Sequence, residues 1–249
     1  MIGILTAALL SFSFPTGSGL VEDDPGLPMY VTTSDYSRIH SVAVLSAIGL
    51  NLEWDDKHLH PGDTPDIGAW KLDAYVEEVL RSKLSGRFAF KTVAYNPADL
   101  LDLTNDPRWR DQLQAAYVAK LNNSGVDAYF LIKPATPIID FPRDNGLGAS
   151  DGSPPFVWAF YRVTLVDAHT GKTLADGLSR IPLSQTEHDF FEIKRGPPYA
   201  RWHSRNNDTV NAEPTPAQWD ALGVDMKALL DLSLRQTLVV LKLDDEPLP

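Results

Sequence analysis

The stretch from Phe156 to Pro182, FVWAFYRVTLVDAHTGKTLADGLSRIP, decides the fold class of this chain. From Val157 onward apolar residues recur at every second position, and the positions between them turn polar partway along. This alternation predicts a sheet strand of about ten residues. Residues 167–172, DAHTGK, are of types that favour turns, and residues 173–181 can then run back antiparallel to the first strand. The stretch therefore predicts a β-hairpin.

The preceding sequence predicts further strands and a helix. Residues 41–50, SVAVLSAIGL, are apolar and rich in β-branched side chains, which is typical of a buried central strand. A helix then begins at Trp70 or Leu72 and ends at Gly86, because its apolar residues recur at i, i+3 and i+4. Two more apolar runs predict a second and a third strand, at residues 88–95 and 127–132.

Asparagine closely followed by proline predicts the start of two helices, at Asn96 and at Asn105. The second helix is longer and ends at the NNSG sequence of residues 122–125. Its apolar stripe is expected to face the core and consists of Trp109, Leu113, Ala116, Tyr117 and Leu121. The first half of the chain thus reads β-α-β-α-β, which favours a sheet with right-handed crossovers and helices packed on it.

The remaining sequence predicts one long helix and two irregular segments. Thr215 and Gln218 form a capping-box pattern with Pro216 between them, so a final helix begins there and lies across the sheet. We predict a single α/β domain with a mixed sheet of about five strands and helices packed on it. Its parts are an apolar segment at 1–19, an extended arm at 20–40, the domain at 41–243 with a flexible loop at 141–155 and a long loop at 184–214, and an acidic tail at 244–249.

Composition excludes several classes of function. The chain has 249 residues, 43% of them hydrophobic, and a formal net charge of −11, which opposes generic binding to nucleic acids. It contains no cysteine, so disulfides, thiol nucleophiles and thiolate metal sites are excluded. The sequence predicts no cofactor, and it contains no phosphate-cradling glycine loop. It also predicts no transmembrane span, and it leaves the oligomeric state open.

The N-terminal sequence allows two interpretations. Residues 2–14, IGILTAALLSFSF, precede a stretch of small residues, which is the outline of a secretory signal peptide without its positive n-region. If residues 1–19 are a signal peptide, the protein is periplasmic or otherwise exported. If they form an ordinary buried segment, it is cytoplasmic.

One basic and aromatic segment is a candidate for binding a partner. Residues 194–206, KRGPPYARWHSRN, contain no acidic residue although the chain as a whole is acidic. Arginine and aromatic side chains contribute much of the binding energy at protein interfaces. The candidate residues are Lys194, Arg195, Tyr199, Arg201, Trp202 and Arg205. In the other interpretation these side chains neutralise the acidic surface of the protein itself.

The alternative function is a metal-dependent or hydrolytic enzyme. His58 and His60 would project to the same side of an extended loop near Asp55 and Asp56, and imidazole with carboxylate suits a divalent transition metal. The loop supplies no further identifiable ligand, so a solvated polar loop is the competing interpretation. Residues 148–152, GASDG, match G-x-S-x-G but precede two prolines and a strand, whereas a nucleophile elbow leads into a helix.

The order of elements resembles that of two bacterial envelope modules, the N-terminal domain of the Tol-system propeller protein and the curli-secretion lipoprotein family. The segments that carry this resemblance are SVAVLSAIG, GVDAYFLIKP and YRVTLVDAHTGKTLADG, within residues 41–181, together with the final helix. The chain is also similar to proteobacterial proteins with a VAVLSAIG opening strand. It departs from the lipoproteins because it has no cysteine to acylate. The resemblance implies a non-enzymatic periplasmic protein that binds or assembles a macromolecular partner, for example another envelope protein.

Overall fold

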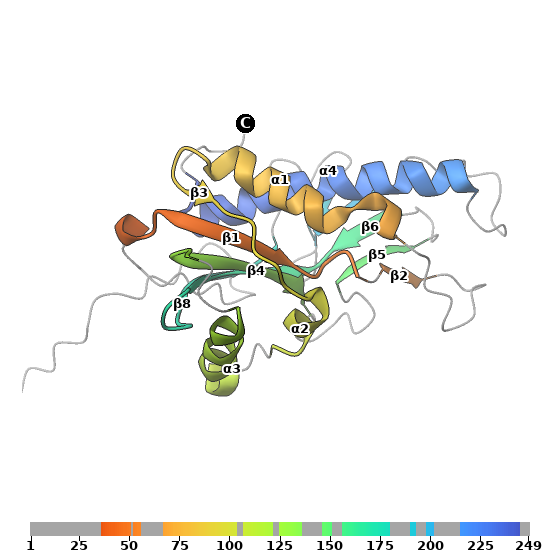
Figure 1. Ribbon diagram of the computed structural model, residues 1–249. Helices are drawn as coiled ribbons and strands as arrows, with labels where there is room; N and C mark the ends of the chain where they lie inside the picture. The colour runs from red at the N-terminus through yellow and green to blue at the C-terminus, as the bar shows by residue number, and fades with distance from the viewer. Residues whose placement is uncertain are drawn as a thin grey trace, which may run out of the picture.

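The computed structural model describes residues 36–50, 52–55, 67–103, 107–121, 125–135, 146–150, 156–179, 190–192, 198–201 and 215–244. These residues form a mixed five-stranded sheet, a second small sheet and helices, as Figure 1 shows. The predicted α/β class is therefore confirmed. Within the described residues, no helix is both long enough and apolar enough to cross a bilayer.

The sheet with the longer strands, called the larger sheet below, contains most of the predicted strands. Its order is β3-β1-β4-β7-β8; β1 pairs in parallel with β3 and β4, whereas β4–β7 and β7–β8 are antiparallel. The predicted hairpin is thus formed by β7 and β8. The strands are β1 (Ser41–Ser46), β3 (Ala89–Phe90), β4 (Ala128–Pro134), β7 (Tyr161–Asp167) and β8 (Thr173–Leu178). The prediction of a strand over 88–95 was too long, since the pairing of β3 with β1 covers only two residues.

Helices cover both faces of this sheet. One face carries α1 (Leu72–Leu84) and α4 (Pro216–Val240), and the other carries α2 (Pro97–Leu101) and α3 (Pro107–Lys120), as Figure 1 shows. The chain passes from β1 to β3 through α1 and then back across β1 to β4 through α2 and α3. These two crossovers run in opposite directions, so the right-handed rule requires their helices to lie on opposite faces.

Short 3-10 helices precede the sheet and α1. They are η1 (Tyr36–Arg38) and η2 (Gly68–Trp70). The end of the predicted extended arm is therefore helical rather than extended. The Tyr36 hydroxyl donates a hydrogen bond to the carbonyl of Leu241, which ties this turn to the C-terminal end of α4.

A second five-stranded sheet was not predicted. Its order is β2-β5-β6-β10-β9, and its strands are β2 (Leu52–Asp55), β5 (Leu147–Ser150), β6 (Phe156–Ala159), β9 (Phe190–Glu192) and β10 (Pro198–Arg201). Two sequence predictions were therefore wrong in part, because the loop expected at 141–155 contains β5 and the loop expected at 184–214 contains β9 and β10. The serine of the G-x-S-x-G match lies in β5, in a strand and not at a nucleophile elbow.

The predicted ten-residue strand divides at Phe160 because its hydrogen-bonding partners change there. The Phe160 carbonyl accepts from the Ala135 amide in the larger sheet, and the Phe160 amide donates to Gly146, next to β5. Before this residue β6 pairs with β5 and β10, and after it β7 pairs with β4 and β8. The two sheets are therefore joined through one nearly continuous strand.

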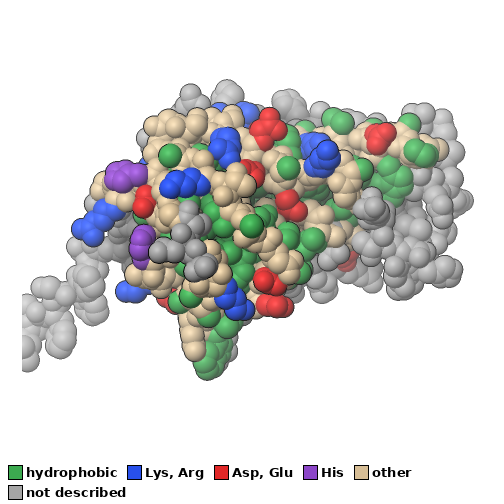
Figure 2. Space-filling view, viewed as in Figure 1, with side chains coloured by type: hydrophobic (Ala, Val, Ile, Leu, Met, Phe, Trp, Pro, Cys, Tyr) green, Lys and Arg blue, Asp and Glu red, His purple; other side chains and the backbone are tan. Residues whose placement is uncertain are grey.

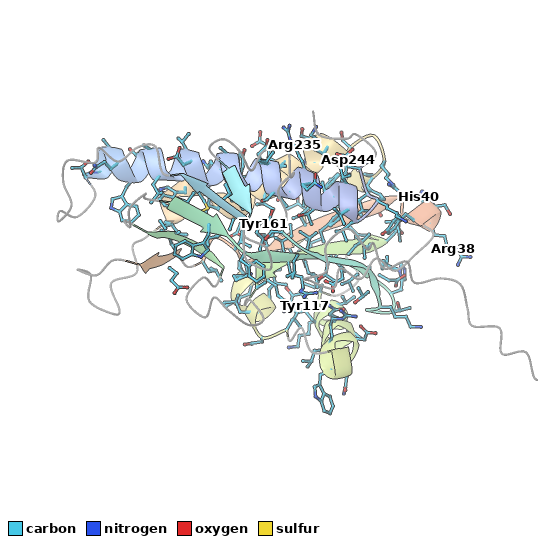
Figure 3. All side chains as sticks on the ribbon, turned by 180° about the vertical axis from the view of Figure 1, so that it is seen from behind. Arg38, His40, Tyr117, Tyr161, Arg235 and Asp244 are labelled. Carbon is cyan, nitrogen blue, oxygen red and sulfur yellow. The ribbon has the colours of Figure 1, made fainter. Side chains whose placement is uncertain are left out.

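The helix α4 packs on α1 and on both sheets, as predicted for a helix lying across the sheet. The capping box of Thr215 and Gln218 is present as predicted. Trp70 and Trp219 meet with ring centroids 5.9 Å apart; Trp70 is buried in the core, and Trp219 packs against it. In the middle of α4, the Ser233 side-chain oxygen lies 2.6 Å from the Tyr161 hydroxyl, and Figure 3 shows Tyr161 on the α4 side of the sheet.

Replacing Gly171, in the turn between β7 and β8, is expected to destabilise the fold strongly. Its φ is +69°, and an added Cβ would lie 2.3 Å from the Cα of Ala115 in α3. We expect Gly171→Ala to lower the free energy of unfolding by roughly 2–4 kcal/mol, through backbone strain and steric overlap. Urea denaturation measures this change.

The matched control is Gly86→Ala, because a Cβ at Gly86 would meet no atom within 4 Å. This control is expected to change stability by less than about 0.5 kcal/mol. Equal effects of the two substitutions would contradict the close packing of the β7–β8 turn on α3.

Candidate functional site

The predicted partner-binding residues are placed only in part. Tyr199 and Arg201 lie in β10, where the backbone of Tyr199 pairs with Trp158 of β6 and that of Arg201 with Phe156. The other four candidates, Lys194, Arg195, Trp202 and Arg205, lie outside the described residues. The role of this segment in binding therefore stays a prediction.

The predicted metal loop also lies largely outside the described residues. Asp55 is the last residue of β2 and pairs with Ser150 of β5, whereas Asp56, His58 and His60 are not described. In the described ranges, no three histidine, aspartate or glutamate side chains lie close enough together to hold a metal ion. The metal hypothesis for the loop itself stays untested.

The described residues include exposed apolar side chains on α2 and on α3. Leu101 of α2 is 43% exposed, and Trp109 and Leu113 of α3 are 56% and 40% exposed. We call these three residues the α2–α3 surface. In Figure 2, hydrophobic side chains gather on the part of the molecule that projects below the sheet, where Figure 1 places α3. The prediction that Trp109 and Leu113 belong to the core was therefore wrong.

The side of α3 that faces the sheet does not coincide with its apolar stripe. Gln114, Tyr117 and Val118 are buried against the sheet, while Trp109 and Leu113 lie on a flank of the helix. Figure 3 shows Tyr117 on the α3 side of the sheet, opposite Tyr161. Burial raises the pKa of the Tyr117 hydroxyl, and the nearby Asp99 carboxylate raises it further.

A buried ion network attaches the start of α3 to the sheet. Asp176 of β8 is fully buried, and its Oδ2 accepts hydrogen bonds from Arg110 of α3 at 3.1 Å and from Arg162 of β7 at 2.5 Å. Its other oxygen accepts from the Thr164 hydroxyl at 2.9 Å. Since Arg110 points toward the sheet, the adjacent Trp109 lies about 100° round the helix from it, on the flank of α3.

Lys133 at the end of β4 lies beside this network. It is 8% exposed, it is the register partner of Arg162, and its ammonium donates to the carbonyl of Leu103. Its pKa is lowered to about 8, mainly because burial disfavours the charged form and also because Arg162 repels it, while Asp176 acts in the opposite direction. The four charged residues Lys133, Arg110, Arg162 and Asp176 are called the sheet-face charge cluster below.

A second cluster of hydrogen-bonded polar side chains lies at the carboxyl end of β1. The Ser46 hydroxyl donates to Asp73 of α1, and that carboxylate also accepts from the Gly49 amide. The Tyr95 hydroxyl donates to the Ser46 carbonyl and accepts from the Ser46 amide. Ser46 is only 1% exposed and its hydroxyl is engaged, so this group holds the loop after β1 and is not suited to nucleophilic catalysis.

Sequence reasoning did not single out the residues of the sheet-face charge cluster. The available signal was a charged side chain within an apolar strand, as at Lys133, Arg162 and Asp176. Such residues are rarely buried unless they are paired, so they predict a network across neighbouring strands. The partner on α3 cannot be identified in this way, because Arg110 is one of several charged residues on that helix.

Comparison with known proteins assigns this chain to no family. No protein-family model matches the sequence, and no curated protein matches it. Among solved structures, a hypothetical protein from Chlamydia trachomatis is similar over 82% of this chain and 98% of its own, with 11% sequence identity and a TM-score of 0.38. Likeness at this level carries no argument about function. The resemblance to the Tol-system and curli-secretion modules therefore stays a prediction.

Removing the carboxylate of the sheet-face charge cluster is expected to destabilise the protein. Asp176→Asn would leave two guanidinium groups, only 16% and 14% exposed, without their anion. We expect the free energy of unfolding to fall by roughly 3 kcal/mol, as measured by urea denaturation. The control is Glu77→Gln, which removes an exposed ion pair with Arg81 and is expected to cost less than about 1 kcal/mol. A similar loss for the control would argue against a special role for Asp176.

Stability should rise with pH through the titration of Lys133. Its pKa is about 8 in the folded chain and is expected to be near its ordinary 10.5 in the unfolded chain. The unfolded state therefore binds more protons between these pH values, and raising the pH relieves the cost of a buried cation. We expect the free energy of unfolding to increase from pH 8 to 10.5 by up to about 3 kcal/mol more in the wild type than in Lys133→Met. If the free energy of unfolding changed equally with pH in the two proteins, this result would contradict the lowered pKa of Lys133.

Proposed function

We propose that this protein is a non-enzymatic binding protein of the bacterial envelope, and that it binds another envelope protein through the α2–α3 surface. The observation that carries the proposal is the exposure of Trp109 together with Leu113 and Leu101. Large apolar side chains that gather on a surface are typical of interaction sites, whereas single exposed ones are common.

The placement of Trp109 suits an interface. Tryptophan is among the residues that most often dominate binding energy, because it buries a large rigid surface when a partner covers it. Arg110 is bound to Asp176 of the sheet, so the helix presents Trp109 in a defined direction before a partner arrives. A preformed surface of this kind loses less conformational entropy on binding.

Charge favours a protein of different sequence as the partner. The net charge of −11 opposes association with nucleic acids and anionic lipids, and it also opposes pairing of two identical chains. Three exposed carboxylates lie on or next to these helices: Asp99 in α2, Asp102 directly after α2, and Asp111 in α3. We therefore infer a partner segment with apolar anchor residues and basic neighbours.

The envelope location rests on the sequence. It is supported by the signal-peptide outline of residues 1–19 and by the resemblance to periplasmic modules. The basic and aromatic segment around Arg195 and Trp202 is a second contact region in this proposal. N-terminal sequencing of the mature protein from its native host tests the location, since cleavage near residue 19 supports export and an intact N-terminus opposes it.

Photocrosslinking in the native host tests the binding surface. A photoreactive amino acid at position 109 is expected to give one discrete adduct with an envelope protein. The same amino acid at position 224 should give no such adduct, because Val224 is an exposed apolar residue of a different helix, α4, and is 66% exposed. The partner identified in this way is then purified and titrated with the wild-type chain.

Trp109→Ser is expected to weaken that binding by roughly 30-fold, because the partner loses a large buried contact, while Val224→Ser leaves it unchanged. Thermal denaturation should show equal stability for both variants, since neither side chain is buried. An adduct between two copies of this chain, or equal binding by both variants, would overturn the proposed surface.

A further inference from the structure

The sheet-face charge cluster carries more positive than negative charge. Lys133, Arg110 and Arg162 are cationic, and the described residues bring two carboxylates to them: the buried Asp176 and the exposed Asp111, whose Oδ1 lies 3.4 Å from the Arg110 Nε. One positive charge is therefore in excess, and Asp176 is the only one of these two carboxylates that is buried with the cations. Lys133 is 8% exposed, and the two arginine side chains are 16% and 14% exposed. Charges removed from water in this way are costly unless an opposite charge compensates them.

Some hydrogen-bond donors of the cluster also have no acceptor among the described residues. The Arg162 Nη1 binds Asp176, but its Nε is buried and has no hydrogen-bond partner among the described residues. The Lys133 ammonium can donate three hydrogen bonds, and the described structure shows one, to the neutral carbonyl of Leu103. A guanidinium edge and an ammonium are together the donor set that binds oxyanions in proteins.

The position of the cluster is one where open α/β sheets bind ligands. The Ile132 carbonyl, directly before Lys133, accepts a hydrogen bond from Ala47, the residue that follows β1. Lys133 therefore lies at the carboxyl ends of two neighbouring parallel strands, β1 and β4. Ligand sites of open α/β sheets form at such positions.

We propose that the sheet-face charge cluster is a binding site for a phosphoryl group, as inorganic phosphate or as a phosphomonoester. A phosphoryl group would compensate the excess positive charge and accept from both the Arg162 Nε and the Lys133 ammonium. The side chains of Arg110 and Arg162 are 16% and 14% exposed, so the cluster is not completely closed from solvent. Acetate has only two acceptor oxygens, so it satisfies fewer of the unused donors of the cluster.

Isothermal titration of the full chain at pH 8 tests the site. Sodium phosphate and glycerol phosphate are compared with sodium acetate at equal ionic strength. Phosphate is expected to bind at one site per chain, and acetate at least roughly tenfold more weakly. Binding of phosphate and glycerol phosphate alike indicates a site for the phosphoryl group itself, whereas binding of inorganic phosphate alone indicates a closed site for the free ion.

Two variants separate this site from general attraction to the protein surface. Lys133→Met keeps the aliphatic volume but removes the ammonium, and is expected to weaken phosphate binding at least roughly tenfold. Arg81→Gln removes an exposed cation that is paired with Glu77 and should leave the binding unchanged. Equal phosphate binding by the wild type and Lys133→Met would overturn the proposal, as would the absence of phosphate binding to the wild type.

A measurement on the wild type alone remains decisive if Lys133→Met does not fold. Because the pKa of Lys133 is about 8, with Arg162 and Asp176 as the charged groups beside it, an arriving anion would raise this pKa and cause proton uptake at pH 8. Titrations in buffers of different ionisation enthalpy should therefore give different apparent binding enthalpies. Identical enthalpies in all buffers would show that phosphate binds away from Lys133 and would overturn the site.

Discussion

The right-handedness of strand crossovers is the constraint on which the rest of this structure depends. The chain leaves β1 through α1 on one face of the sheet and returns across β1 through α2 and α3 on the other. The face of α1 also receives the long helix α4, and together they bury a large apolar cluster. The opposite face receives one helix of five residues and one of fourteen. The two faces therefore differ in how completely helices cover them.

The face that α2 and α3 cover carries both the sheet-face charge cluster and helices with exposed apolar side chains. Its apolar cluster ends at Tyr129, Leu131 and Val166, and beyond these residues the same face carries Lys133, Arg162 and Asp176. Asp176 binds Arg110, which attaches α3 to the sheet. A charged pair in this place is less stabilising than apolar packing would be, but it is directional, and so it defines how α3 is rotated.

That rotation connects the two proposed sites. Arg110 faces the sheet-face charge cluster, and Trp109, the next residue toward the N-terminus, lies on an exposed flank of the same helix. Any anion that strengthened the cluster would also hold α3 in its present orientation. Trp109 and the charge cluster are thus linked through one helix, and the interactions of its sheet-facing side determine what its exposed flank presents.

The sequence by itself determined the elements whose signals are local. Periodicity identified β1, α1, β4, the β7–β8 hairpin and α4, and the capping box located the start of α4, because these patterns depend on near neighbours in the chain. The tertiary structure decided the division of the long strand at Phe160, the second sheet and the outward position of Trp109. The partners in each case are remote in sequence: Ala135 and Gly146 for Phe160, and Asp176 for the helix that carries Trp109. An apolar stripe shows that a helix has two unlike sides, but only its contacts with other elements decide which side is buried.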